Sequence, residues 1–283
     1  MISRSWDQTT RRWDLEAGNE IEDAPDICEH QVFVVTVSRD GRWVVTASGD
    51  VVTGELLKAR DVETGIVKFF EGHSRRITYI DISADSMLLA SGAEEFTARI
   101  WSLAIGKLVA ALFKSAYMVG AVRFSQNSKK FAVLSIVGKH LEVWDVETQT
   151  LDISRETHWR RSNKYETSNS ECDPMTIYEF DGSTLETVGS PFKGHTGLIR
   201  HLTLSFDCAL LASASDDNTI KLWAFESRQL PGSFSVQKPF YIIFPPGNSR
   251  KMAYTTQSDK KIHICNTPPN ILTLLDIHIP SFY

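Results

Sequence analysis

Residues 194–225 read GHTGLIRHLTLSFDCALLASASDDNTIKLWAF, with a Gly-His pair at the start and Trp223 near the end. Between these markers lie two runs rich in aliphatic residues, separated by polar turn residues, which predicts strands joined by tight turns. In TIKLW, Ile220 and Leu222 fall on one face of the predicted strand, and Lys221 and Trp223 fall on the other. The stretch therefore predicts part of a β-sheet.

Pieces related to TIKLW recur along the whole chain. They are TTRRWDLEAG at 9–18, LLKARDVETG at 56–65, TARIWSLAIG at 97–106, HLEVWDVETQ at 140–149, TIYEFDGSTL at 176–185, TIKLWAFESR at 219–228 and KIHICNTPPN at 261–270. The positions equivalent to Trp223 lie 36–47 residues apart, with a mean of 42. This period is typical of the four-stranded blades of a β-propeller. We therefore predict an all-β fold.

We predict one β-propeller domain over residues 1–283, made of about seven four-stranded units. The predicted units are roughly 1–27, 28–68, 69–110, 111–152, 153–191, 192–230 and 231–283. The first unit is predicted to be incomplete because little sequence precedes TTRRWDLEAG to form an innermost strand. The fifth is predicted to be incomplete because its first half, 156–171, is polar and suits a mobile loop. We expect a fragment or a shortened product of a longer repeat array.

Short markers inside the units resemble those of the WD-repeat β-propeller family. They include Gly-His at 72–73 and 194–195, Trp-Asp at 13–14 and 144–145, and the turn SRDG at 38–41. A single Trp-Asp pair means little, but seven units in phase form a specific signal. The last unit also resembles the closing repeat of large fungal WD-repeat families, which would make this chain a shortened member.

The resemblance implies a hydrogen-bond network of His195, Ser213, Asp217 and Trp223 in the sixth unit, with His73, Trp101 and Trp144 in related places. A His-Asp pair can also serve catalysis, because imidazole both donates and accepts hydrogen bonds. Catalytic groups are seldom repeated from unit to unit, however. We therefore interpret the network as structural, joining strands within each sheet.

Composition and motifs favour a non-enzymatic protein inside the cell. Net charge is −5 and hydrophobic residues make up 42%, which gives no bulk attraction to nucleic acid. The sequence has no CxxC pair, secretory signal, membrane span, phosphate-binding loop, HExxH or GxSxG motif. We expect no cofactor, metal, membrane or small-molecule substrate, and a cytoplasmic or nuclear location. The four cysteines are Cys28, Cys172, Cys208 and Cys265.

The family resemblance implies a protein–protein interaction scaffold whose partners, proteins or peptides, dock on the top face of the propeller. The alternatives are a ligand-sensing repeat segment of a larger signalling receptor, or a substrate-receptor or chromatin-complex subunit. A basic segment, HWRRSNK at 158–164, is interpreted as a solvated loop rather than a nucleic-acid site. The candidate partner-binding residues are Gln31, Phe33, Arg76, Thr78, Glu94, Met118, Leu198, Arg200, Asp216, Lys238 and Phe240.

Overall fold

The computed structural model describes most of the chain as antiparallel β-sheet. The described residues are 2–4, 10–13, 20–21, 32–50, 54–135, 140–156, 175–205, 207–244, 251–258, 261–268 and 271. They form two compact units: the first comprises Met1–Glu171 with Gly182–Leu185, and the second comprises Cys172–Asp181 with Glu186–Tyr283.

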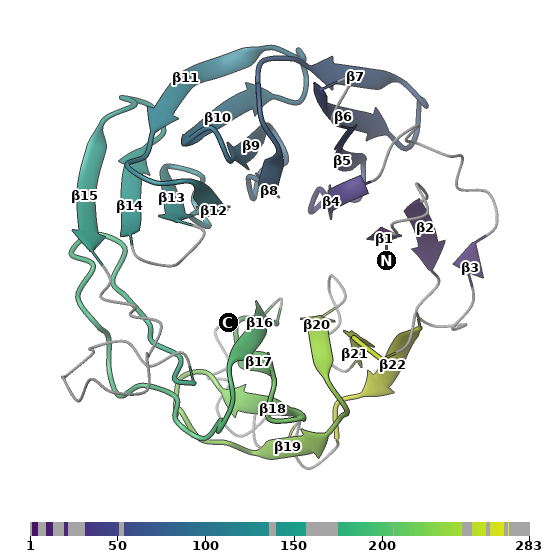
Figure 1. Ribbon diagram of the computed structural model, residues 1–283, viewed down its shortest axis with the longest axis vertical. Helices are drawn as coiled ribbons and strands as arrows, with labels where there is room; N and C mark the ends of the chain where they lie inside the picture. Colours follow the sequence, from purple (N-terminus) through teal and green to yellow (C-terminus); the bar gives the residue numbers. More distant parts are fainter. Residues whose placement is uncertain are drawn as a thin grey trace, which may run out of the picture. The chain divides into compact units, whose positions relative to one another are not determined.

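The first unit contains four consecutive sheets, in the orders β1-β2-β3, β4-β5-β6-β7, β11-β10-β9-β8 and β12-β13-β14-β15. Each sheet is a meander of strands neighbouring in sequence. Within this unit β4, β8 and β12 lie beside one another, and β7, β11 and β15 form the opposite edges of their sheets (Figure 1). The strands are β1 (Ile2–Arg4), β2 (Thr10–Trp13), β3 (Glu20–Ile21), β4 (Val32–Val37), β5 (Trp43–Asp50), β6 (Gly54–Asp61), β7 (Val67–Phe70), β8 (Ile77–Ile82), β9 (Leu88–Ala93), β10 (Thr97–Ser102), β11 (Leu108–Lys114), β12 (Val119–Phe124), β13 (Lys130–Ser135), β14 (His140–Asp145) and β15 (Leu151–Glu156).

The second unit contains the sheets β16-β17-β18-β19 and β20-β21-β22. Before them, residues 175–181 and 186–192 contribute two isolated bridges, Ile177 with Phe192 and Phe180 with Thr187. The strands of this unit are β16 (Ile199–Leu204), β17 (Leu210–Ser215), β18 (Thr219–Ala224), β19 (Gly232–Ser235), β20 (Pro239–Ile243), β21 (Lys251–Thr256) and β22 (Ile262–Asn266).

The turn between the first two strands of a sheet repeats one local design. In Ser38–Asp40 the serine hydroxyl donates to the aspartate Oδ1 at 2.5 Å, and the backbone N–H of Trp43 donates to the same serine at 2.8 Å. Ser83–Asp85 and Ser205–Asp207 form the same hydroxyl–carboxylate contact at 2.5 and 2.6 Å. Such side chain to backbone bonds favour tight turns, and they fix where each second strand begins.

The cores lie between neighbouring sheets of the same unit. Trp43, Leu57 and Phe70 of the β4–β7 sheet pack with Leu89 and Trp101 of the β8–β11 sheet. A second cluster joins the β8–β11 and β12–β15 sheets, and a third joins the two sheets of the second unit. Both faces of an internal sheet are therefore covered, which explains its long apolar runs.

The predicted fold class is confirmed: the chain is an all-β propeller protein built from antiparallel blades of about four strands. The prediction of about seven units stays a prediction. The first predicted unit contains three described strands, one more than its sequence indicated, because Ile2–Arg4 pairs with β2. The predicted mobile loop at 156–171 lies outside the described residues apart from Glu156. In the described residues no helix is long and apolar enough to cross a membrane.

Candidate functional site

The predicted network of the sixth unit comes together around the side chain of Ser213 in β17. The indole N–H of Trp223 donates to Ser213 Oγ at 2.9 Å, and His195 Nε2 lies 2.6 Å from the same oxygen. His195 Nδ1 lies 2.7 Å from Asp217 Oδ2. Because a carboxylate only accepts, Nδ1 carries the proton, and the serine hydroxyl donates to Nε2. The four residues form one continuous chain of hydrogen bonds, called the histidine network below.

Burial and hydrogen bonding set the charges in this network. Burial lowers the pKa of His195, and Asp217 only partly opposes this. Burial would raise the pKa of Asp217, but hydrogen bonds from Thr219, from the Thr196 N–H and from His195 outweigh it and lower the pKa to about 2. At neutral pH the network therefore pairs a neutral imidazole with a carboxylate.

The β8–β11 sheet holds the same network with a longer acid. Trp101 Nε1 donates to Ser91 Oγ at 2.9 Å, and His73 bridges Ser91 and Glu95 with two contacts of 2.7 Å. Glu95 also accepts from Thr97 Oγ1 at 2.7 Å and from the Ser74 hydroxyl. Burial opposes ionisation of Glu95, yet these hydrogen bonds lower its pKa to about 2. Glu95 therefore takes the place that Asp217 has in the other network, and it keeps the contact between the acid and the histidine.

The β12–β15 sheet supplies a different acceptor for the indole N–H of its tryptophan. Val133 pairs with Glu142, as Ser91 pairs with Arg99 and Ser213 with Lys221 in the other two sheets. Valine offers no acceptor, and the indole of Trp144 donates instead to Glu142 Oε2 at 3.2 Å. Glu142 is buried and also contacts Ser115 Oγ and His140 Nε2, each at 3.3 Å.

Glu142 is the residue that sequence reasoning missed. Trp144 was predicted to belong to a network, but its acceptor was not. A signal was present: the position two residues before the tryptophan carries a base in TARIW and TIKLW but an acid in HLEVW. That exchange coincides with loss of the Gly-His turn, and together these changes indicate a substitute acceptor.

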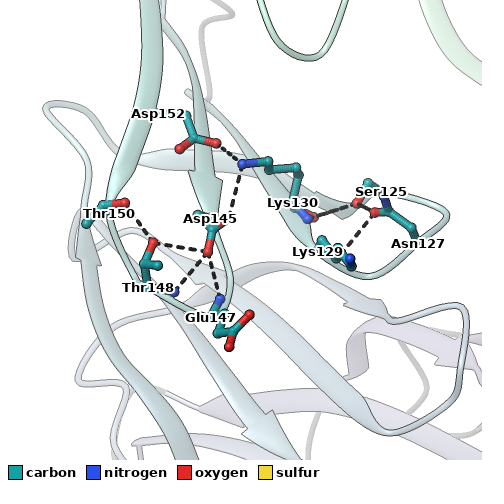
Figure 2. A network of polar contacts seen from close by, with 9 residues as sticks. All are labelled: Ser125, Asn127, Lys129, Lys130, Asp145, Glu147, Thr148, Thr150 and Asp152. Carbon is teal, nitrogen blue, oxygen red and sulfur yellow. Dashed lines mark hydrogen bonds and ion pairs between the residues drawn. The ribbon is translucent and has the colours of Figure 1, made fainter.

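At the opposite end of the β12–β15 sheet, a second network surrounds Lys130 (Figure 2). Lys130 Nζ lies 3.1 Å from Asp145 Oδ2 and also contacts Asp152. Asp145 accepts from the N–H groups of Glu147 and Thr148 at 3.0 and 2.8 Å. The Thr148 N–H, Lys130 and the Thr148 hydroxyl lower the pKa of Asp145 to about 2. This network closes the β14–β15 turn at an exposed edge.

The described candidate partner-binding residues of the first unit lie at the end of the strands that carries the histidine networks, called the histidine end below. Arg76 is exposed, and its guanidinium lies 4.4 Å from the ring centroid of Phe33. Thr78 instead links sheets, because its hydroxyl contacts Gly92 O at 3.0 Å and Val119 O at 2.6 Å. Two further candidates, Glu94 and Met118, are half-buried, and Gln31 lies outside the described residues.

In the second unit the candidates form two groups. Arg200 and Asp216 are exposed and joined by two contacts of 2.7 and 2.6 Å. The Lys238 N–H donates to Asn218 Oδ1 at 2.9 Å, which ties that loop to the β17–β18 turn. Phe240 is exposed beside Tyr241, at 4.7 Å between ring centroids. Leu198 is half-buried, and its carbonyl accepts from the Asp216 N–H at 2.9 Å.

Among the described side chains, no group of three or more His, Cys, Asp or Glu residues is arranged to hold a metal ion. The histidine networks use both ring nitrogens of their histidines within the protein. Their arrangement satisfies buried polar groups and joins strands. That this joining is their whole role stays a prediction.

Sheets of this pattern, with a tryptophan, a serine and a Gly-His turn linked in one network, define a class. The WD domain, G-beta repeat, matches residues 65–102 and 185–224. These segments contain Trp101 and the whole histidine network of the second unit. The chain is a WD40-repeat β-propeller protein.

Relatives with established names are distant. The chain is 21% identical over 257 residues to eukaryotic translation initiation factor 3 subunit I of Drosophila grimshawi, covering 82% of this chain and 78% of the relative. It is 27% identical over 190 residues to the subunit of the same name from Bombyx mori, covering 60% of this chain and 56% of that protein. Proteins of this class are typically non-catalytic.

Proposed function

We propose that this protein is a non-catalytic scaffold subunit whose protein partners dock at the histidine end of its sheets. The observation that carries the proposal is that, within each unit taken separately, exposed charged side chains lie at this end with an aromatic side chain among the candidates. Arg76 stacks on Phe33 in the first unit, and Arg200 pairs with Asp216 in the second. Arginine and aromatic residues are enriched among the side chains that contribute most to protein interfaces.

Rigid support makes such a surface effective. The loops before β8 and β16 each contain a histidine whose ring is held by two side-chain contacts. The residues that follow each histidine are therefore held close to one position before a partner arrives. Binding then requires little ordering of the loop, which would otherwise oppose association.

The similarity to translation initiation factor 3 subunit I supports a place within a multiprotein assembly, because that relative is by name a subunit. We propose that this chain serves likewise in an assembly related to translation initiation, and that it works in the cytoplasm. The finer proposal, docking at the histidine end, rests on the side chains of this chain and can fail separately.

Affinity purification followed by mass spectrometry tests the proposal. Arg76→Glu and Arg200→Glu should each remove partners that the unmodified chain retains, because each reverses a charge at the proposed surface. Lys129→Glu and Glu226→Lys are the matched controls, since both residues are exposed in turns at the opposite end of their strands. Retention of every partner by both arginine variants would reject docking at the histidine end. Recovery of no protein partner by the unmodified chain would reject the scaffold itself.

A further inference from the structure

The opposite end of the strands contains a cavity in the first unit, away from the histidine networks. Its volume is about 270 Å³, and its walls are the turns of two neighbouring sheets, β4–β7 and β8–β11. Trp43 lines it and is only 6% exposed. The cavity therefore has an aromatic wall that is already fixed by the core.

Both cations in the cavity wall are engaged by the protein. Arg42 Nε and Nη2 each lie 2.9 Å from Asp61 Oδ2. Lys68 Nζ donates to Leu103 O at 2.8 Å and to the carbonyl of Ala104, and it lies 4.8 Å from the Trp43 ring centroid. Oxygen atoms of the protein therefore already neutralise part of the charge of both cations.

Two carboxylates at the mouth have no cation paired with them in the cavity wall. Asp40 and Asp85 both line the cavity and are exposed. Each uses Oδ1 to accept from its own turn, at 2.5 Å from a serine hydroxyl and 3.0 Å from a backbone N–H. Those donors are uncharged, and Arg42, the cation that interacts with Asp40, pairs directly with Asp61, so both carboxylates keep part of their attraction for a further cation.

Exposed apolar side chains surround the same mouth. Ile66 and Met87 line the cavity and are 57% and 55% exposed. Ile105 follows the lining residue Ala104 and is 69% exposed. Exposed apolar side chains gathered near one mouth beside polar groups are typical of an interaction site.

We propose that this cavity is a second docking site, for a segment of a partner protein that carries lysine or arginine beside apolar residues. The apolar side chains of the segment would pack on Ile66, Met87 and Ile105, and its cation would lie between Asp40 and Asp85. Apolar contact supplies most of the affinity, and the exposed ion pairs supply less. The site is independent of the histidine end, so either proposal can fail alone.

The chain itself shows how to remove the charge without damaging the turn. Asn127 occupies the corresponding place in the β12–β13 turn, where its Oδ1 lies 2.7 Å from Ser125 Oγ and 3.1 Å from the Lys129 N–H (Figure 2). Asp40→Asn and Asp85→Asn should therefore keep the turn geometry. The matched control is Asp207→Asn with Glu226→Gln, which removes the same charge in the second unit.

Fluorescence anisotropy with the full chain provides the test. The probe is a labelled peptide GSGLKFKGSG, compared with GSGLEFEGSG and GSGSKSKGSG. The first peptide should bind best, and the Asp40→Asn/Asp85→Asn variant should weaken it about tenfold. Ile105→Ser should weaken it as well, whereas the control variant should bind it unchanged.

Four outcomes would overturn the proposal. Equal weakening of peptide binding in the control variant would show attraction to net charge alone. Preference for the acidic peptide would show that the site does not favour a positively charged segment. Absence of binding by all three peptides would remove the site. A photo-reactive version of the first peptide should cross-link to residues 62–66, 85–87 or 104–107, and cross-links confined to other segments would also reject it.

Discussion

The β16–β19 and β12–β15 sheets each supply an acceptor to the indole of an equivalent tryptophan, but by different chemistry. In the first, Ser213 accepts from the indole and is itself held by His195 and Asp217. In the second, Val133 stands at the serine position, and Glu142 accepts from Trp144 across a contact of 3.2 Å. The physical requirement is an acceptor for the buried indole N–H, and more than one residue can meet it.

The two networks differ in the number of structural elements that they connect. The histidine network connects the loop before β16, the second strand, the third strand and the turn between them. Glu142 and Trp144 belong to one strand, although Glu142 also contacts Ser115 in the loop before β12. We therefore expect damage to spread further in the β16–β19 sheet than in the β12–β15 sheet.

Removal of the tryptophans should give the largest loss in the free energy of unfolding. Trp223 is 1% exposed, and Trp223→Ala should lower the free energy of unfolding by about 3–5 kcal/mol through lost packing. Trp144 is only half-buried, so Trp144→Ala should lose less. Chemical denaturation with hydrogen-exchange mass spectrometry can assign each loss to its sheet. Equal losses would contradict the difference between the two networks.

Removal of the serine hydroxyl at the centre of a histidine network should give the second-largest loss of stability. Ser213→Ala leaves the indole of Trp223 and one nitrogen of His195 without a partner, and each buried group costs about 1–3 kcal/mol. Ser91→Ala should cause a similar loss of stability in the β8–β11 sheet, because Ser91 makes the same two contacts there. Ser227→Ala, in an exposed turn, is the control. The measurement is the denaturation midpoint, and a loss no greater than that of the control would show that water replaces the hydroxyl.

Acidification should weaken the two sheets that contain histidine networks in two steps. Burial lowers the pKa of His73 and His195 below 6.5, so the unfolded chain takes up these protons first and stability falls below about pH 6.5. The carboxyls of Glu95 and Asp217 have pKa values lowered to about 2, so stability falls again between about pH 4.5 and 2.

Melting temperatures measured from pH 8 to pH 2 would reveal both steps. A His73→Gln/His195→Gln variant should be less stable at every pH but should lose the first step. A first step that persists unchanged in this variant would assign it to other groups.

The Lys130 network should give the smallest effect, because it lies at an exposed edge where ion pairs add little. In Lys130→Met the pKa of Asp145 should rise but stay below 3.8, since the Thr148 N–H and hydroxyl still donate to it. NMR titration of the Asp145 carboxyl measures this. An Asp145 pKa that reaches its ordinary value would show that Lys130, and not the turn, controls it.

Local patterns made the fold predictable from sequence. The 42-residue spacing and the alternation in segments such as TIKLW follow from the strand period, and they indicate blades without any knowledge of contacts. The residues of the histidine network could be predicted by resemblance, because their motifs are repeated. The role of Glu142 as an acceptor could not be predicted, because it depends on the pairing of Glu142 with Val133, which is known only from the strand register.

Other features depend on contacts between elements distant in sequence. The cavity beside Trp43 is formed by turns from two sheets, and no single motif marks it. In the fifth predicted unit, TIYEFDGSTL resembles a third strand, yet Ile177 forms only an isolated bridge with Phe192. Both residues pack on Trp223 instead. The burial of this segment therefore depends on the neighbouring β16–β19 sheet.

Gly92 in β9 sets how closely two sheets of the first unit can approach. A Cβ placed there would lie 2.4 Å from Val119 Cγ1 in β12. The same junction is fixed by Thr78, which donates to Val119 O, and by Asp81, which accepts from the Phe124 N–H at 2.8 Å. Any larger residue at this position would wedge the inner strands apart while those bonds resist. The absence of one methyl group at Gly92 therefore sets the spacing between these two sheets, and an alanine there would have to push β9 and β12 apart.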